Sequence, residues 1–200
     1  MDKLAVLRQS FGFPAFRAGQ QTLIDAVLSG RDALGVMPTG GGKSLCYELP
    51  ALLLPGMTLV VSPLISLMKD QVMALRNAGI PAGCINSSMS LDELRETYRD
   101  ARYGAYKLLY VAPERLLTDG FCSLAQELEI PLVAVDEAHC ISQWGQDFRP
   151  SYLKIVEFLQ RLPRRPAVAA FTATATAQVR ADIIRILQLH EPETVVTGFD

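Results

Sequence analysis

The sequence predicts an α/β fold, a mostly parallel sheet with helices on both faces. Five short apolar runs rich in Val, Leu and Ala recur along the chain, and stretches with helical spacing lie between them. Such continuous apolar runs are typical of strands buried in a parallel sheet. A polar motif follows each run directly. Because ligands bind at the carboxyl ends of the strands in open α/β sheets, we expect these motifs at one edge of the sheet.

The five expected strands are taken in chain order. They are residues 33–37, 58–62, 107–112, 132–136 and 167–171. The polar motifs that follow them are "PTGGGKS", "PLISLMKDQ", "PERL", "DEAHCISQWGQDFRP" and "TATAT".

Three helices are expected from apolar residues that recur every three or four positions. The first covers 65–75 and stops at Gly79, and the second covers 91–101 and stops at Gly104. Ser90 and Glu93 form a capping box at the start of the second helix. Residues 179–186 give the third helix, and a further helix is expected to begin near the lysine of the "GGGKS" segment.

Composition limits the class of protein. The 200 residues are half hydrophobic, which predicts one folded domain over 1–200. A net charge of -2 argues against a strongly basic nucleic-acid binder, but it allows a local basic cleft. The four cysteines form no C-x-x-C pair, so we expect buried free thiols rather than zinc ligands or disulfides. No apolar run approaches the roughly 20 residues of a membrane span, so we expect no membrane partner and a cytoplasmic protein, nucleoid-associated if bacterial.

The stretch "MPTGGGKS" (37–44) is close to the phosphate-binding pattern G-x-x-x-x-G-K-[ST], with Met37 at the first glycine position. Glycines let backbone N–H groups turn around an anion at the start of a helix. Lys43 is expected to reach the β- and γ-phosphates, and Ser44 to bind Mg²⁺. The alternative is a glycine turn followed by an exposed lysine. The expected phosphate-binding residues are Thr39, Gly40, Gly41, Gly42, Lys43 and Ser44.

Two acidic residues end the expected strand at 132–136. Asp136 stands where a P-loop enzyme needs a carboxylate to hold Mg²⁺. Glu137 is placed to orient and deprotonate an attacking water. Two adjacent buried acids would be costly without a metal or a cationic partner. The alternative is a solvated acidic turn.

The motifs together resemble the first motor domain of a superfamily 2 helicase, and more narrowly the RecQ family of DNA helicases. The similarity rests on "FGFPAFRAGQ", "MPTGGGKSLCY", "VVSPLISLMKDQ", "APERL" and "DEAHCISQWGQDFRP", and it runs from about residue 10 to residue 200. It implies a RecA-like P-loop NTPase fold that uses ATP and Mg²⁺. Helicases of this superfamily often lack the first glycine, so Met37 fits, and Phe171 stands where the family usually has Leu.

The resemblance also implies roles for individual residues. Phe13, Arg17 and Gln20 fall in the adenine-recognition segment, against the alternative of a core Phe and a helix-capping Gln. His139 would link the Mg²⁺ site to the "TAT" motif and, with Lys43 and the two acids, form the catalytic set. The residues implied in DNA binding and in its coupling to hydrolysis are Ser62, Pro63, Lys69, Arg115, Gln143, Trp144, Phe148, Arg149, Thr172 and Thr174.

Residues 142–150 resemble the aromatic-rich loop that couples DNA binding to ATP hydrolysis in that family, and they carry the only tryptophan of the chain. A core position is the alternative for Trp144, whereas ordinary strand-end structure is the alternative for the other segments. The polar neighbours of Trp144 argue against the core.

The expected function is that of an ATP-dependent 3′–5′ DNA helicase motor that acts on single-stranded and duplex DNA. The family has a second motor domain, which brings an arginine finger, and zinc-binding and winged-helix regions. None of these lies in this sequence, so the domain alone is not expected to unwind DNA. Two alternatives stay open: an RNA helicase of the same superfamily, and a nucleotide-binding module without catalysis. A P-loop kinase would need a phosphoacceptor site and a lid, and neither is evident.

Overall fold

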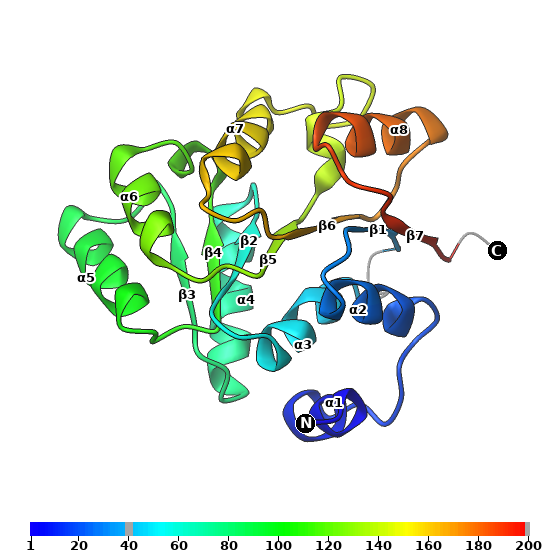
Figure 1. Ribbon diagram of the computed structural model, residues 1–200, viewed down its shortest axis with the longest axis horizontal. Coiled ribbons are helices and arrows are strands. Elements are labelled where there is room, and N and C mark those ends of the chain that lie inside the picture. Colours follow the sequence, from blue (N-terminus) through cyan, green and yellow to red (C-terminus); the bar gives the residue numbers. More distant parts are fainter. Residues whose placement is uncertain (39–41, 199–200) are drawn as a thin grey trace.

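The computed structural model describes residues 1–38 and 42–198, and within them one parallel sheet forms the centre of the molecule (Figure 1). Its seven strands are ordered β3-β4-β2-β5-β6-β1-β7, and every neighbouring pair is parallel. The strands are β1 Ala33–Val36, β2 Thr58–Val61, β3 Ala82–Ile85, β4 Leu108–Val111, β5 Leu132–Val135, β6 Ala167–Thr172 and β7 Glu193–Val196.

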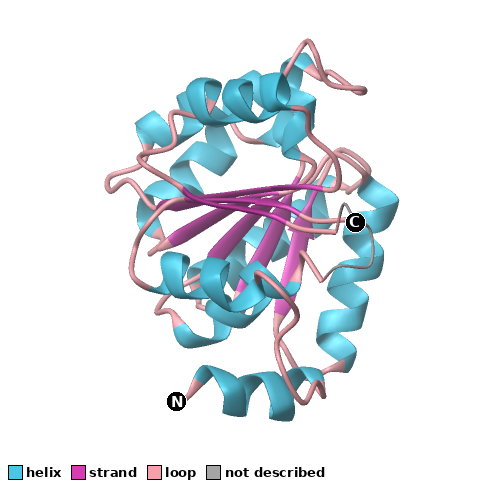
Figure 2. Ribbon diagram, turned by 90° about the vertical axis from the view of Figure 1, so that its right-hand side faces the viewer, coloured by secondary structure: helices cyan, strands magenta, loops and turns pink. Residues whose placement is uncertain are grey.

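Helices cover both faces of the sheet, as Figure 2 shows. One face packs against α2, α3 and α4, with α1 lying outside α2 and α3, and the other face packs against α5, α6, α7 and α8. The helices are α1 Lys3–Phe11, α2 Gln20–Leu28, α3 Leu45–Leu53, α4 Ile65–Asn77, α5 Leu91–Arg102, α6 Asp119–Glu127, α7 Lys154–Arg161 and α8 Ala177–Ile186. Three short 3₁₀ helices are η1 Pro113–Arg115, η2 Ala138–Ile141 and η3 Pro150–Leu153.

The five strands expected from the sequence are confirmed, and two edge strands were missed. β3 reads AGCI and has only one β-branched residue, which gives a weak strand pattern. β7 alternates between partly buried and exposed residues, because its successive side chains point to opposite faces of the sheet, so it lacks a continuous apolar run. The Ser90 cap expected for α5 is confirmed, because its hydroxyl accepts a hydrogen bond from the Glu93 backbone N–H at 3.1 Å.

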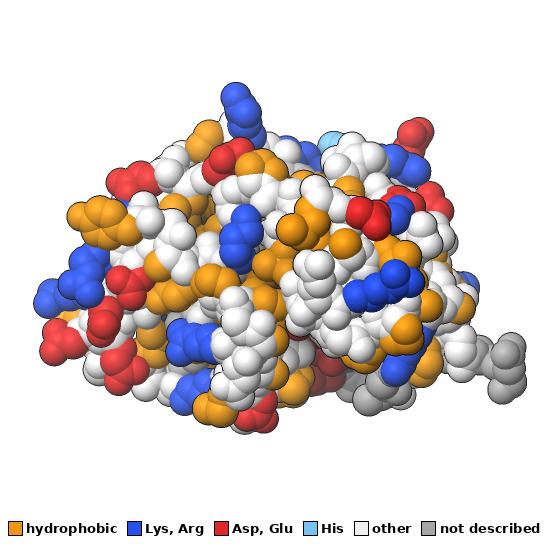
Figure 3. All heavy atoms as spheres, turned by 90° about the horizontal axis from the view of Figure 1, so that it is seen from below, with side chains coloured by type: hydrophobic (Ala, Val, Ile, Leu, Met, Phe, Trp, Pro, Cys, Tyr) orange, Lys and Arg blue, Asp and Glu red, His pale blue; other side chains and the backbone are white. Residues whose placement is uncertain are grey.

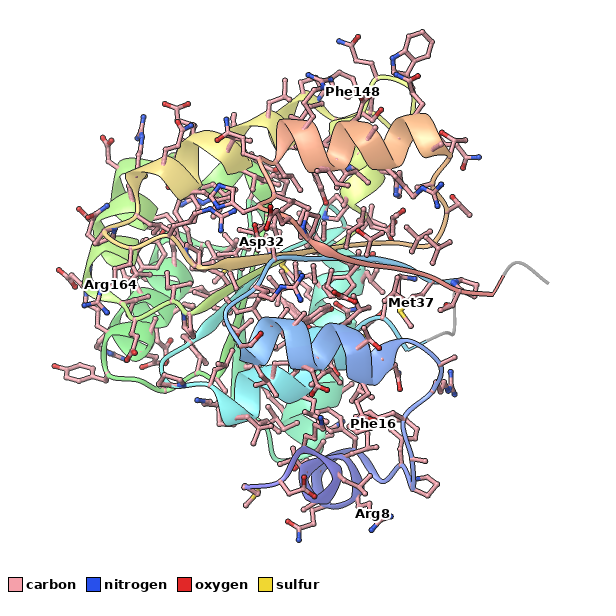
Figure 4. The ribbon with its side chains drawn as sticks, turned by 45° about the vertical axis from the view of Figure 1, so that its right-hand side comes forward. Arg8, Phe16, Asp32, Met37, Phe148 and Arg164 are labelled. Carbon is pink, nitrogen blue, oxygen red and sulfur yellow. The ribbon has the colours of Figure 1, made fainter. Side chains whose placement is uncertain are left out.

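The parallel arrangement places the carboxyl ends of β1, β2, β4, β5 and β6 at one edge of the sheet, as expected. The opposite edge carries an ion pair between a buried aspartate and a more exposed arginine. Asp32, 2% exposed, receives two hydrogen bonds from the Arg165 guanidinium at 3.0 and 2.7 Å, and it also accepts from the backbone N–H groups of Val168 and His190. Figure 4 shows Asp32 and Met37 near the two ends of β1.

The four cysteines are free, as expected, but only two of them are buried. Cys46 and Cys140 are enclosed, and burial raises the pKa of each thiol to about 12. Cys84 and Cys122 are partly exposed, so the expectation of four buried thiols is wrong for these two. Among the described residues, no helix is both long enough and apolar enough to span a bilayer.

Candidate nucleotide site and aromatic-rich loop

The phosphate-binding segment connects β1 to α3. Met37 is buried at the end of β1, and Lys43 and Ser44 stand immediately before the first turn of α3. The helix therefore directs its N-terminal N–H groups toward the space beside these two side chains. Gly42 has a φ of +80°, and a Cβ atom there would lie 2.2 Å from the Gln20 Nε2 atom. Thr39, Gly40 and Gly41 lie outside the described residues.

A cavity of about 670 Å³ opens beside this segment. A space of this size holds a nucleotide. It brings together the residues expected to bind adenine, phosphate and metal; those that line it are Phe13, Arg17, Gln20, Gly42, Lys43, Ser44, Asp136 and Glu137. Figure 3 views the molecule from the side of α1 to α3, and acidic atoms are visible deep in a hollow of the surface.

Asp136 is a buried carboxylate at the end of β5. It is 6% exposed, and its Oδ1 atom accepts a hydrogen bond from the Glu137 N–H at 2.9 Å. No ion pair to Asp136 is found within residues 1–38 and 42–198. Burial, and then the charge of Glu137, raise the pKa of Asp136 to about 6, although the nearby Lys43 ammonium acts in the opposite direction. A divalent cation would supply the missing positive charge, so Asp136 and the Ser44 hydroxyl fit a Mg²⁺ site.

Glu137 leaves the strand in a left-handed conformation with a φ of +50°. Non-glycine residues adopt this conformation at a cost, and it is found at functional sites more often than elsewhere. The Glu137 Oε2 atom lies 3.5 Å from His139 Nδ1. The backbone turn therefore places the second acid beside the histidine of the same motif.

His139 connects this turn to the "TAT" segment after β6. Its Nδ1 atom lies 2.8 Å from the Thr172 hydroxyl, and that hydroxyl donates to the Thr174 carbonyl at 3.0 Å. A hydroxyl has one proton, so Thr172 accepts from His139 and the imidazole carries its proton on Nδ1. Thr172 is buried and Thr174 is exposed. The bond between them therefore links the His139–Thr172 contact to the protein surface.

The adenine-recognition segment precedes α2. Phe13 is 45% exposed, so the alternative of a core phenylalanine is wrong. Gln20 is buried as the first residue of α2; its Oε1 atom accepts from the Arg17 N–H at 2.7 Å, and its Nε2 atom donates to the Gly42 carbonyl at 3.1 Å. One N–H and one lone pair of this amide stay available for a base edge. Gln20 thus joins the adenine segment to the phosphate segment.

The segments expected to contact the DNA backbone follow two neighbouring strands. Ser62 follows β2 and is fully buried, and Arg115 is in η1 after β4, which pairs with β2. The Ser62 Oγ and Arg115 Nε atoms are both buried and have no hydrogen-bond partner in the described part of the chain. Pro63 is half-buried and Lys69 is exposed on α4. The geometry places three of these residues after strand ends and Lys69 on α4, and it assigns none of them a role.

The aromatic-rich loop lies on the other side of the sheet from α1 and α2. Figure 4 shows Phe148 beyond one face of the sheet and Phe16 beyond the other. Trp144 is 74% exposed, so the alternative of a core tryptophan is wrong. Gln143 is exposed as well, and Phe148 is half-buried. The Arg149 guanidinium pairs with the Asp147 carboxylate at 3.0 Å, and the Arg149 backbone N–H donates to the Cys140 carbonyl at 2.8 Å.

Sequence reasoning missed two groups that border the acidic site. Tyr152, in η3, is fully buried, and its hydroxyl donates to the Asp136 carbonyl at 2.7 Å. Glu48, one turn after Ser44 on α3, lines the cavity, and burial raises its pKa to about 7. The spacing of Glu48 from Ser44 could have placed it near the site, whereas nothing in the sequence marks the contact of Tyr152.

Comparisons with known proteins agree with this geometry. The sequence profile of DEAD/DEAH box helicases matches residues 17–183. The chain is 50% identical over 196 residues to the ATP-dependent DNA helicase RecQ of Bacillus subtilis, covering 98% of this chain and 33% of that protein. It is 48% identical over 197 residues to RecQ of Pasteurella multocida, covering 98% of this chain and 31% of that protein. The chain therefore spans about a third of the length of these curated relatives.

Among solved structures, a hypothetical ATP-dependent RNA helicase from Sulfolobus tokodaii superposes with a TM-score of 0.72 at 21% identity. The match covers 96% of this chain and 56% of that one. At this identity the likeness concerns the fold alone, and it confirms the expected RecA-like architecture. The profile match, the fold and the similarity to RecQ proteins lead to one conclusion: the chain belongs to the DEAD/DEAH box helicase family.

Proposed function

We propose that this helicase motor hydrolyses Mg·ATP and couples hydrolysis to 3′–5′ movement along single-stranded DNA and to the unwinding of duplex DNA. The observation that supports the proposal is the cavity that Lys43, Ser44, Asp136 and Glu137 line together. The choice of DNA and the polarity rest on the similarity to RecQ helicases. The domain boundaries 1–200, and a second motor domain in cis, are part of the proposal.

The residues of the site divide the work of phosphoryl transfer. The Ser44 hydroxyl and the Asp136 carboxylate would hold Mg²⁺, which neutralises charge on the phosphates when bound. Lys43 places its ammonium against the β- and γ-phosphates from the start of α3. Glu137 accepts a proton from the attacking water, and the His139 ring, held by Thr172, stands beside that carboxylate at 3.5 Å.

Adenine selection would come from the segment before α2. The Phe13 ring is exposed at the cavity and can stack on a base, and the Gln20 amide keeps a donor and an acceptor for the adenine edge. Charge that develops in the transition state would be stabilised by an arginine of the second motor domain. For that reason this domain by itself is not expected to unwind DNA.

Measurements of ATP hydrolysis distinguish this function from two others. An RNA helicase would show ATP hydrolysis stimulated by single-stranded RNA and not by DNA. A nucleotide-binding module without catalysis would bind ATP and release no phosphate under any condition. The two adjacent acids argue against the second, because a binding module has no need of the proton acceptor that Glu137 provides.

The decisive experiment measures phosphate release with no polynucleotide, with single-stranded DNA and with single-stranded RNA, in the natural protein that contains this chain. We expect stimulation by DNA, and we expect Lys43→Ala to lower the stimulated rate by roughly 100-fold or more, because it removes the cation facing the phosphates. Its melting temperature should stay near the wild-type value, because Lys43 is only half-buried at the cavity. Wild-type turnover in this variant, or stimulation by RNA alone, would refute the proposal.

A further inference from the structure

A buried hydrogen bond joins the base of the aromatic-rich loop to helix α8. Ser142 is fully buried, and its hydroxyl donates to the Asp182 Oδ2 atom at 2.7 Å. The same hydroxyl oxygen accepts a hydrogen bond from the Trp144 backbone N–H at 3.1 Å. Ser142 is therefore a junction between the carboxylate on α8 and the backbone of the exposed tryptophan.

We propose that Asp182 is a positioning residue that fixes the orientation of Trp144 through Ser142 and thereby sets how strongly DNA contact stimulates ATP hydrolysis. The inference rests on the proposed function for its link to hydrolysis. Its structural part, the attachment of the loop to α8, is independent of that function and can be measured separately.

Asp182 is a charged residue at a buried position of α8 that an apolar residue could fill. It is only 7% exposed, and its second oxygen accepts a hydrogen bond at 3.1 Å from Arg185, whose side chain is 72% exposed. An apolar side chain would fill the same position without desolvating a charge. The hydroxyl of Ser142, and then Arg185, hold the pKa of Asp182 below its usual value, so the acceptor stays charged at neutral pH.

Near its tip the loop is held by the Ser142 contacts and by the Gly145 N–H, which donates to the Ser142 carbonyl at 3.1 Å. Trp144 stands between two hollows of about 280 and 260 Å³, the first lined by residues that include Thr174 and Thr176 and the second by residues that include Phe148 and Asp182. The indole borders both hollows and is 74% exposed, so little packing holds it. The bond from the Trp144 backbone N–H to the Ser142 hydroxyl ties the base of this side chain to α8 through Asp182.

Helix α8 also begins at the segment that contacts the catalytic histidine. Thr176 caps the helix by accepting a hydrogen bond from the Val179 N–H at 3.2 Å, and Thr172, four residues earlier, contacts His139. One rigid helix thus holds the base of the loop at Asp182 and starts beside the histidine contact. A displacement of Trp144 can reach the site through this connection.

The test uses the only tryptophan of the chain as a probe of the loop, with any tryptophan elsewhere in the natural protein replaced by Phe. Asp182→Ala should lower the fluorescence anisotropy of Trp144 and increase its quenching by acrylamide. In the same variant the ratio of DNA-stimulated to basal hydrolysis should fall by roughly tenfold, because a misplacement of about 1 Å can cost about 100-fold in rate. Ser142→Ala should give the same result, and the double variant should lose little more.

Ile183→Val is the matched control, because it loosens the buried face of the same helix without touching Ser142. It should lower the melting temperature and leave the anisotropy and the stimulation ratio unchanged. Unchanged Trp144 anisotropy in Asp182→Ala, or additive losses in the double variant, would overturn the attachment. Greater mobility of Trp144 with an unchanged stimulation ratio would overturn the coupling, whereas no stimulation even in the wild type would count against the proposed function and leave the attachment standing.

Discussion

Asp136→Asn is expected to raise the free energy of unfolding of the metal-free protein. The same substitution should abolish Mg²⁺ binding at this site. The pKa of Asp136 is raised from 3.8 to about 6 in the folded state, so folding favours the protonated acid. The stability from that preference is present below pH 3.8 and is lost as the pH rises through about 6. At 1.36 kcal/mol per pKa unit, the charged form at pH 8 costs the folded state about 3 kcal/mol at most.

Urea unfolding of the wild type and of Asp136→Asn, without metal, at pH 4 and pH 8 measures this cost. The Asn variant should be the more stable protein at pH 8 by up to about 3 kcal/mol, and the difference should shrink toward pH 4. Mg·ATP should then stabilise the wild type and have little effect on the variant. A variant less stable than the wild type at pH 8 would show that Asp136 is stabilised by protein partners, and the metal-site reasoning would fail.

Asp32→Asn is the control, because it is expected to lower stability at pH 8 where Asp136→Asn raises it. Burial raises the pKa of Asp32, but the hydrogen bonds from Arg165 and from the backbone N–H groups of His190 and Val168 outweigh it, and the pKa is lowered. Its stabilising effect is therefore present above pH 3.8 and is lost as the pH falls through the lowered folded-state value. This variant should be less stable than the wild type at pH 8, with a smaller difference in acid.

Three further substitutions test the site. Glu137→Gln should bind Mg·ATP and hydrolyse it roughly 100-fold or more slowly, because an amide accepts no proton; single-turnover phosphate release checks this. Gln20→Ala should lose the preference for ATP over GTP and weaken both nucleotides, since the bond to Gly42 is lost as well; equal wild-type affinity for the two would contradict adenine recognition. Tyr152→Phe should cost about 1 kcal/mol of stability by leaving the Asp136 carbonyl unpaired and should slow hydrolysis more than that loss explains; calorimetry and steady-state rates separate the two effects.

The central strands and the edge that carries the site could be predicted from the sequence, because a strand buried on both sides reads as a continuous apolar run. The edge strands could not, because β7 is half-exposed and β3 has only one β-branched residue. The residues of the nucleotide cavity could be named from motif spacing, since these motifs follow strand ends that the sheet brings together. Tyr152 and Asp182 could not, because their contacts span 16 and 40 residues and depend on how η3 and α8 pack.

The position of the loop relative to the site limits how a signal can pass between them. Figure 4 places Phe148 on the opposite face of the sheet from the adenine segment, so the two regions cannot touch. The chain from Asp136 to Tyr152 forms a closed loop, because the Tyr152 hydroxyl returns to the Asp136 carbonyl at 2.7 Å. A second hydrogen bond, from the Arg149 backbone N–H to the Cys140 carbonyl, closes a smaller loop within it. These two bonds connect the backbone of the loop that carries Trp144 to Asp136, and we expect a displacement of the loop to act on Asp136 through them.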